Sequence, residues 1–262
     1  MSKSNGEVHK PNDYVTTFDP DAYFQHYFGK SIEDGTRVSL FALPVFAHLI
    51  VQTMRPNERQ TLLDIGAGPT VYSALCFRDV VKEVYLTDYV EKNLDRVKEW
   101  LAGSTTYDWK PTIKVILRTE GGHFLQQGII ETSEEKAKGV VKCGGVYFAD
   151  VHQNPVVPNM EGRQVDILLT IFTLESACQT YEQYKVCMKN MMNHLRPGGR
   201  FILGSVLEDD EYNSGRSVMF TLLNLTETKI LNALEEVGID MGSVKKYVLN
   251  DEGVMFLMAT KF

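Results

Sequence analysis

The chain has 262 residues, with 27 basic and 34 acidic side chains, a net charge of -7 and a hydrophobic content of 44%. This length predicts one large domain, residues 1–262, with a sizeable core. The acidic balance argues against a general nucleic-acid binder, which needs a basic face to meet phosphates.

Neither a metal site nor a targeting signal is predicted. The four cysteines contain no C-x-x-C pair and the six histidines no H-x-x-x-H pair. The N-terminal residues are polar and lack an apolar signal core. Since no uninterrupted apolar run approaches the roughly 20 residues of a membrane span, we expect a cytoplasmic protein without membrane contact.

The N-terminus predicts a loose tail and then a helix. Residues 1–12 have little to bury. Asp19 is a suitable helix cap because it precedes a proline in the first helical position. Three aromatic residues, Tyr23, Tyr27 and Phe28, then share one helix face, and by spacing alone this indicates an amphipathic helix docked on the core.

A glycine-rich turn follows the first predicted strand, residues 61–65. Its sequence is Gly66-Ala67-Gly68-Pro69, and a helical segment, residues 70–76, comes next. The two glycines let the backbone turn tightly and approach a ligand that a Cβ would push away.

Three aspartates mark the ends of predicted strands: Asp64, Asp88 and Asp150. In doubly wound folds the acid in the place of Asp88 accepts hydrogen bonds from ribose hydroxyls. Together with the turn, these acids indicate a nucleoside site. The alternative is a turn with a purely structural role.

The turn also bears on which nucleoside binds. A dinucleotide fingerprint needs a third glycine where this chain has Val71, and no P-loop pattern is present. Backbone approach to an amino-acid-bearing nucleoside suits S-adenosylmethionine better. A Pro-Gly-Gly sequence at residues 197–199, before another strand, fits the same interpretation.

Hydrophobic periodicity and caps predict the remaining elements. Helices are expected at residues 40–54, 91–101, 131–138, 179–195 and 227–237, the last capped by Thr226. Strands are expected at residues 146–150, 165–172 and 201–206, with a final antiparallel hairpin of 245–249 and 254–260. Residues 112–118, TIKVILR, also have strand-like propensity.

Several longer segments resemble one family. LLDIGAGPTVY, LTDYVEKNLDRVKEWL, YDWKP, LESAC and LRPGGRFIL are similar to the nicotinamide, phenylethanolamine and indolethylamine N-methyltransferases, and the resemblance covers nearly the whole chain. It implies an α/β, Rossmann-like class I fold with a mostly parallel seven-stranded sheet and an antiparallel C-terminal hairpin. A tail and helical lid would occupy residues 1–55 and the core residues 56–262. The resemblance also implies a helix at residues 112–118, and we expect a monomer.

The resemblance implies a set of residues around S-adenosylmethionine. Asp150 would take the adenine amino group and the Val151 N–H a ring nitrogen, and Asn93 would reach the ribose unless it is only a surface residue of its helix. Phe28 stands in place of a family tyrosine, so a hydroxyl contact is either lost or supplied by Tyr27. The expected cofactor residues are Tyr23, Phe28, Gly66, Ala67, Gly68, Thr70, Tyr72, Asp88, Tyr89, Asn93, Asp150, Val151 and Ile171.

For the methyl acceptor, the resemblance points to Asp209 and Tyr212. Glu175 is a candidate because it follows the strand predicted at residues 165–172, at whose carboxyl end ligands bind. Tyr27 and Ser205 are also expected at the acceptor. Glu175 and Asp209 are the expected catalytic residues, since either carboxylate could accept an amine proton. The nicotinamide branch has an aspartate where this chain has Ser205, which favours an arylalkylamine over a pyridine acceptor.

Two rival functions stay open. A nucleic-acid methyltransferase would flip a base into its site, but no N-P-P-[YF] motif is present. A non-catalytic module would bind the cofactor without turnover on any amine.

Overall fold

The protein is represented by a computed structural model that describes residues 8–29, 36–122 and 127–262. At its centre is a seven-stranded sheet in the order β4-β3-β2-β5-β6-β10-β9. The strands are β2 (Thr61–Ile65), β3 (Glu83–Asp88), β4 (Gly145–Phe148), β5 (Val165–Ile171), β6 (Leu195–Val206), β9 (Ile239–Leu249) and β10 (Val254–Lys261). Strands β2 to β6 are parallel, whereas β10 is antiparallel to both of its neighbours, β6 and β9. The predicted sheet and C-terminal hairpin are confirmed.

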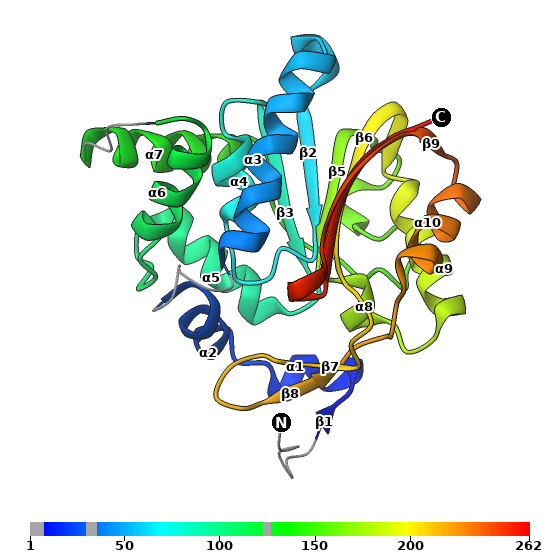
Figure 1. The fold of residues 1–262 in the computed structure, drawn as a ribbon. Helices are drawn as coiled ribbons and strands as arrows, with labels where there is room; N and C mark the ends of the chain where they lie inside the picture. Colours follow the sequence, from blue (N-terminus) through cyan, green and yellow to red (C-terminus); the bar gives the residue numbers. More distant parts are fainter. Residues whose placement is uncertain (1–7, 30–35, 123–126) are drawn as a thin grey trace.

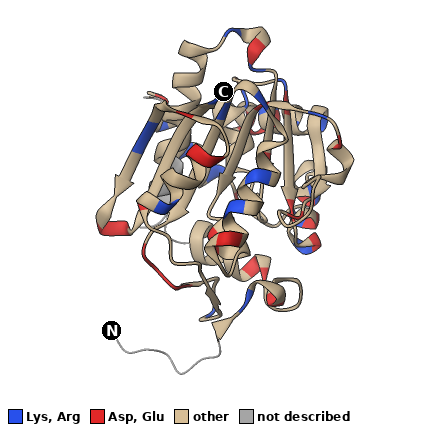
Figure 2. Ribbon diagram, turned by 90° about the vertical axis from the view of Figure 1, so that its right-hand side faces the viewer, with Lys and Arg blue, Asp and Glu red and all other residues tan. Residues whose placement is uncertain are grey.

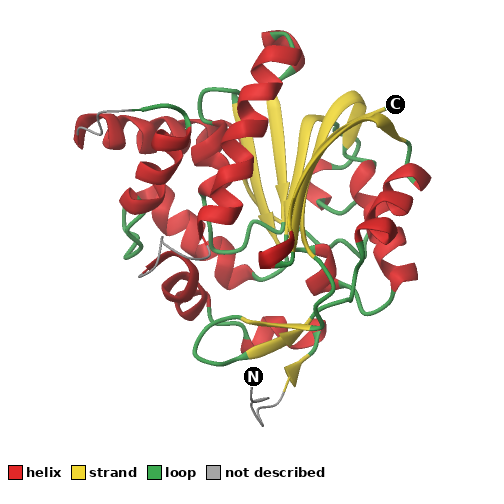
Figure 3. Cartoon of the chain, in the orientation of Figure 1, coloured by secondary structure: helices red, strands yellow, loops and turns green. Residues whose placement is uncertain are grey.

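Helices cover both faces of this sheet (Figures 1 and 3). One face carries α3 (Thr36–Thr53), α4 (Tyr72–Phe77), α5 (Glu91–Ala102), α6 (Lys110–Thr119) and α7 (Gln127–Gly144). The other carries α8 (Leu174–Ala177), α9 (Tyr181–Met192) and α10 (Glu227–Glu236).

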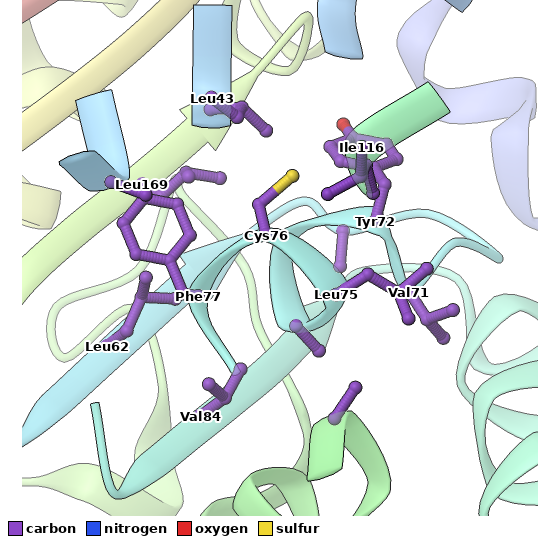
Figure 4. Close-up of a cluster of buried hydrophobic side chains, with 14 of the residues drawn as sticks. Leu43, Leu62, Val71, Tyr72, Leu75, Cys76, Phe77, Val84, Ile116 and Leu169 are labelled. Atoms are coloured by element: carbon purple, nitrogen blue, oxygen red, sulfur yellow. The ribbon is translucent and has the colours of Figure 1, made fainter. Parts of the chain in front are cut away.

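Two apolar clusters fill the space between sheet and helices. In β5, Ile167 and Leu169 face one cluster and Leu168 the other, which explains its continuous apolar sequence. Figure 4 shows the first cluster, where Phe77 of α4 meets side chains of β2 and β5.

A small second sheet lies below the carboxyl ends of the main strands in Figure 1. Strand β1 (Val8–His9) pairs in parallel with β8 (Met219–Thr221), which pairs antiparallel with β7 (Glu211–Asn213). The 3-10 turn η1 (Pro11–Asp13) and helix α1 (Tyr14–Thr17) follow β1. The prediction of a loose tail at residues 1–12 is therefore wrong for residues 8–12, because Val8 and His9 pair with a distant hairpin and the 3-10 turn η1 follows them. Residues 1–7 lie outside the described part.

The aromatic N-terminal helix is shorter than predicted. Asp19 caps α2 (Pro20–Phe24) by accepting the N–H groups of Asp21 and Ala22, as predicted. A π-helical turn, η2 (Gln25–Gly29), then continues it.

The strand-like propensity of residues 112–118 is misleading, because they belong to helix α6. Ile113, Ile116 and Leu117 lie at helical spacing and are buried together, so tertiary packing overrides the preference of β-branched residues. The helix implied by the family resemblance is confirmed.

Other differences concern element ends. Helix α9 begins two residues later than predicted, because the Thr180 side chain caps it by accepting the Gln183 N–H. It ends at Met192 because β6 already begins at Leu195 and contains the Pro-Gly-Gly sequence. Short 3-10 turns stand at Pro56–Glu58, Pro158–Met160 and Asn250–Glu252.

Acidic and basic positions are interspersed along the chain (Figure 2). Within the described ranges, none of the helices has the length and apolar character needed to cross a membrane.

Candidate active site

A cavity of about 340 Å³ lies at the carboxyl ends of β2, β3, β4 and β5. In open parallel sheets this edge is where ligands bind. Eleven of the thirteen predicted cofactor residues line it: Tyr23, Gly66, Ala67, Gly68, Tyr72, Asp88, Tyr89, Asn93, Asp150, Val151 and Ile171. Of the predicted acceptor residues, Tyr212 lines it.

The two glycines of the turn have different roles. Gly66 has a φ of 79°, and a Cβ there would overlap the Thr173 side chain. Gly68 has a φ of 63°, but a Cβ there would meet nothing within 4 Å. Gly66 is therefore required by packing within the protein, whereas Gly68 leaves room for a ligand.

Asp64 does not line this cavity, although it ends the first strand. It is buried, and its Oδ2 accepts the Ser73 hydroxyl at 2.5 Å. Burial raises the pKa of Asp64 to about 7. The inference that three strand-end acids face a nucleoside is therefore corrected to two, since Asp64 points into the protein.

Asp88 organises the middle of the cavity. Its carboxylate accepts the N–H of Gly68 at 2.8 Å, the N–H of Val90 at 2.8 Å and the Asn93 amide at 3.0 Å. Burial raises the pKa of Asp88, and these hydrogen bonds oppose the rise. Asn93 Oδ1 is buried and has no hydrogen-bond partner among the described residues. A polar ligand group at this place would satisfy it, so the site fits a ribose.

The far wall comes from the loop after β4. Asp150 Oδ1 accepts the backbone N–H of His152 at 2.9 Å. Asn190 of α9 holds the loop by donating to the Val151 carbonyl oxygen at 3.1 Å. Asp150 and Val151 are thus fixed on the cavity wall.

The other end of the cavity is aromatic. The hydroxyls of Tyr14 and Tyr212 are 2.7 Å apart, and the Tyr14 ring stacks on Phe220 at 4.1 Å. Burial raises the pKa of both Tyr14 and Tyr212 well above the usual value, so both hydroxyls stay neutral. Phe18 and Tyr23 complete this wall.

Two predicted cofactor residues, Phe28 and Thr70, do not line the cavity but pack against or support residues that do. Phe28 is buried against Tyr72, with ring centroids 6.0 Å apart. The Thr70 hydroxyl donates to the Ala67 carbonyl oxygen at 2.7 Å and holds the turn.

Four predicted acceptor residues do not line the cavity: Tyr27, Glu175, Ser205 and Asp209. The expected acidic pocket formed by Glu175 and Asp209 is therefore not present. Tyr27 donates its hydroxyl to the Asn213 carbonyl oxygen at 2.8 Å. Ser205 is buried in β6. Asp209 lies on an exposed loop, where its carboxylate accepts the Asp210 N–H.

Glu175 is buried, with 1% of its surface exposed. Its Oε1 accepts the Val206 N–H at 2.7 Å, and its Oε2 has no hydrogen-bond partner in the described structure. The Ser205 hydroxyl beside it donates to the Val206 carbonyl oxygen at 3.1 Å. Burial raises the pKa of Glu175 to about 7, and its charge acts on Tyr14.

Sequence reasoning missed lining residues that belong to the N-terminal segment, to short loops and to helix α8: Tyr14, Phe18, His152, Thr173, Ser176 and Ala177. The spacing of Tyr14 and Phe18, one helical turn apart, was the available signal for the first two.

The strand order, the antiparallel final hairpin and the cavity beyond the strand ends are those of the class I methyltransferase fold. Magnesium protoporphyrin IX methyltransferase from Synechocystis, solved with bound S-adenosylmethionine, shares this fold. The TM-score is 0.59 at 11% identity, covering 99% of this chain and 100% of that one.

The model of the NNMT/PNMT/TEMT family matches residues 6–262, and the chain belongs to this family. It is 27% identical over 275 residues to nicotinamide N-methyltransferase of Caenorhabditis elegans, covering 98% of this chain and 96% of that one. It is also 27% identical over 260 residues to indolethylamine N-methyltransferase of Oryctolagus cuniculus, covering 95% of each chain. The protein is therefore an S-adenosylmethionine-dependent N-methyltransferase.

Proposed function

We propose that this enzyme methylates the nitrogen of a small aromatic amine of the arylalkylamine type. The observation that carries the proposal is a cavity with two chemically different ends. Asp88, Asn93 and Asp150 make one end polar, while Tyr14 and Tyr212 make the other aromatic. The polar end suits a nucleoside, and the aromatic end suits a flat acceptor ring.

At the polar end, Gly68 would leave space for the methionine-bearing part of the cofactor. Asp88 and Asn93 would hold the ribose, and Asp150 and Val151 the adenine. S-adenosylmethionine supplies a sulfonium methyl group that is already activated for in-line displacement. The remaining task of the protein is positioning, which can contribute roughly 7–11 kcal/mol.

At the aromatic end, the rings of Tyr14, Phe18 and Tyr212 would pack on the acceptor and exclude water. An amine must lose its proton to attack, and we assign Glu175 as the proton acceptor. Ser176, the next residue in the chain, lines the cavity, as does Tyr14, on which the charge of Glu175 acts, so the proton would pass through hydroxyls or water. A carboxyl group with a pKa of about 7 is well matched to this task.

A second candidate acceptor is a pyridine nitrogen. It is favoured by the absence of an acid among the lining residues of the aromatic end in the described structure. A pyridine nitrogen needs no proton acceptor, so neutral tyrosines would suffice.

The test is methyl transfer by the full chain to tryptamine, a phenylethanolamine and nicotinamide, compared as kcat/KM. We expect the highest value with an arylalkylamine. A much higher value with nicotinamide would overturn the amine proposal. Cofactor binding without transfer to any nitrogen would overturn acceptor methylation altogether.

We further propose that the enzyme acts as a monomer and not on nucleic acid. The net charge of -7 supports the second point, because a nucleic-acid site needs a basic surface. Gel filtration would test the first point, and methyl transfer to DNA or RNA the second.

A further inference from the structure

Three potential metal ligands meet beside the cavity: His152, Cys178 and Cys187. His152 Nδ1 lies 3.3 Å from Cys187 Sγ, and the three ligand atoms all lie within 4.8 Å of one another. They come from three separate segments, so no C-x-x-C or H-x-x-x-H spacing announces them in the sequence.

The two sulfur atoms are on fixed elements. Cys187 lies on the buried side of α9, with 0% of its surface exposed. Cys178 ends α8, where its N–H donates to the Leu174 carbonyl oxygen at 3.0 Å. Neither thiol is in a disulfide. A cation would therefore find both sulfur atoms already in place.

The histidine is oriented for coordination. His152 Nε2 lies 3.0 Å from the Ala177 carbonyl oxygen, which can only accept, so Nε2 carries the hydrogen. Nδ1 is then the unprotonated nitrogen, and it faces Cys187. A metal-binding histidine typically donates its other ring N–H to a carbonyl or carboxylate in this way.

We propose that His152, Cys178 and Cys187 form a site for a zinc-class cation, one that prefers nitrogen and sulfur ligands. Tetrahedral Zn²⁺ with its usual bond lengths would separate such ligand atoms by about 3.6–3.8 Å. The observed separations, from 3.3 Å up to 4.8 Å, require only small adjustments.

Binding would release one proton from each thiol to solvent, and two thiolates would balance the charge of the cation. Oxygen-preferring cations such as Mg²⁺ do not suit these ligands. His152 is exposed, so a water molecule can take the fourth position. The three ligands would bind the cation whichever nitrogen the enzyme methylates.

The site would connect to the cavity through shared residues. His152 and Ala177 line the cavity, and His152 follows the expected adenine contacts Asp150 and Val151. A bound cation would tie this loop to α8 and α9 and fix the cavity edge.

The test is titration of the reduced full chain with Zn²⁺ against a competing chelator. We expect uptake of one Zn²⁺ per chain. The variants His152→Ala, Cys178→Ala and Cys187→Ala should each weaken binding by more than about 100-fold, since even outer-shell partners are worth about 10- to 100-fold. Co²⁺ in place of Zn²⁺ should give thiolate-to-metal charge-transfer absorption, which reports the ligands directly.

Two exposed residues outside the cluster serve as matched controls, Cys143→Ala and His48→Ala, and both should bind like the parent chain. His152 is exposed, so its variant keeps the test sound if a buried cysteine variant fails to fold. Affinity that is unchanged in His152→Ala, or lowered equally in the controls, would overturn the site.

Discussion

At the scale of single residues, Asp88 joins three parts of the proposed cofactor site. It holds Gly68, Val90 and Asn93 at once, so its loss would remove a ligand acceptor and loosen the turn. We expect Asp88→Ala to weaken S-adenosylmethionine binding by about 1.5–3 kcal/mol, the worth of hydrogen bonds to a charged group. Calorimetric titration would measure this.

Asp209→Ala is the matched control for Asp88, because that aspartate is exposed and away from the cavity. It should leave cofactor affinity unchanged. Equal affinity in Asp88→Ala and the parent chain would remove Asp88 from the cofactor site.

The two glycines of the turn allow a matched pair of substitutions. Gly66→Ala should mainly destabilise the fold, because the new Cβ overlaps Thr173. Gly68→Ala carries only the conformational penalty of a positive φ, about 1–2 kcal/mol, yet its Cβ enters the space assigned to the ligand. We expect Gly68→Ala to lose cofactor affinity while still unfolding cooperatively. Normal cofactor affinity in Gly68→Ala would place the ligand elsewhere.

Glu175 distinguishes the two acceptor classes. With a pKa of about 7, its carboxylate becomes available as a proton acceptor as the pH rises through 7. Amine methylation should therefore rise across this range and fall by roughly 100-fold in Glu175→Gln, within the usual contribution of a general base. Pyridine methylation should change much less. Rates measured from pH 6 to 9 on both substrates would check this, and equal losses would make Glu175 structural.

At the scale of elements, the N-terminal segment and the β7–β8 hairpin close the cavity together. Tyr14 bonds Tyr212, Tyr27 bonds the backbone of Asn213, and Arg216 pairs with Asp19 at 3.1 Å. Segments nearly 200 positions apart thus form one cover. Both elements carry lining residues, so we expect this cover to move when ligands enter.

We therefore expect the cofactor product, S-adenosylhomocysteine, to stabilise this cover. Trypsin cleavage after Arg216, in the exposed hairpin turn, should slow several-fold when it binds. Cleavage after Lys82, an exposed turn residue outside the lining, is the internal control. The lid hypothesis fails if both cuts respond equally.

At the scale of the whole molecule, the sheet could be predicted because its central strands carry apolar runs, such as Leu62-Leu63 in β2 and residues 167–169 in β5. β5 contributes side chains to both clusters, as a continuous apolar sequence such as residues 167–169 indicates. Helix α6 could not be predicted from propensity, because its β-branched residues favour strands until a partner surface buries them.

The residues at the polar end of the site could be predicted, because the topology places the carboxyl ends of the parallel strands and the glycine turn at one edge of the sheet. Side-chain direction was beyond sequence reasoning. Asp64 ends a strand like Asp88, yet it turns to Ser73. Asp209 follows a strand like Glu175, yet it lies exposed. The cluster of His152, Cys178 and Cys187 could not be predicted from the sequence either, because tertiary packing assembles it from three segments.

The stability of the fold depends on pH through two buried carboxyl groups, those of Asp64 and Glu175. The folded pKa of both Asp64 and Glu175 is raised by burial to about 7, whereas unfolded carboxyls titrate near pH 4. Between these values the folded chain binds more protons than the unfolded chain. The free energy of unfolding contributed by these groups is therefore fully present below about pH 4 and is lost as the pH rises to about 7.

Carboxylates in exposed ion pairs make stability change with pH in the opposite direction. The parent chain is therefore compared with a variant that lacks only the two buried carboxyl groups. Asp64→Asn combined with Glu175→Gln removes both titrations while keeping the side-chain shapes. Relative to the parent, this variant should gain stability as the pH rises from 4 to 7, by up to about 1.4 kcal/mol per pH unit for each group. Urea unfolding at several pH values would measure the difference. Parallel stability curves for the two proteins would show that neither carboxyl titrates as its burial requires.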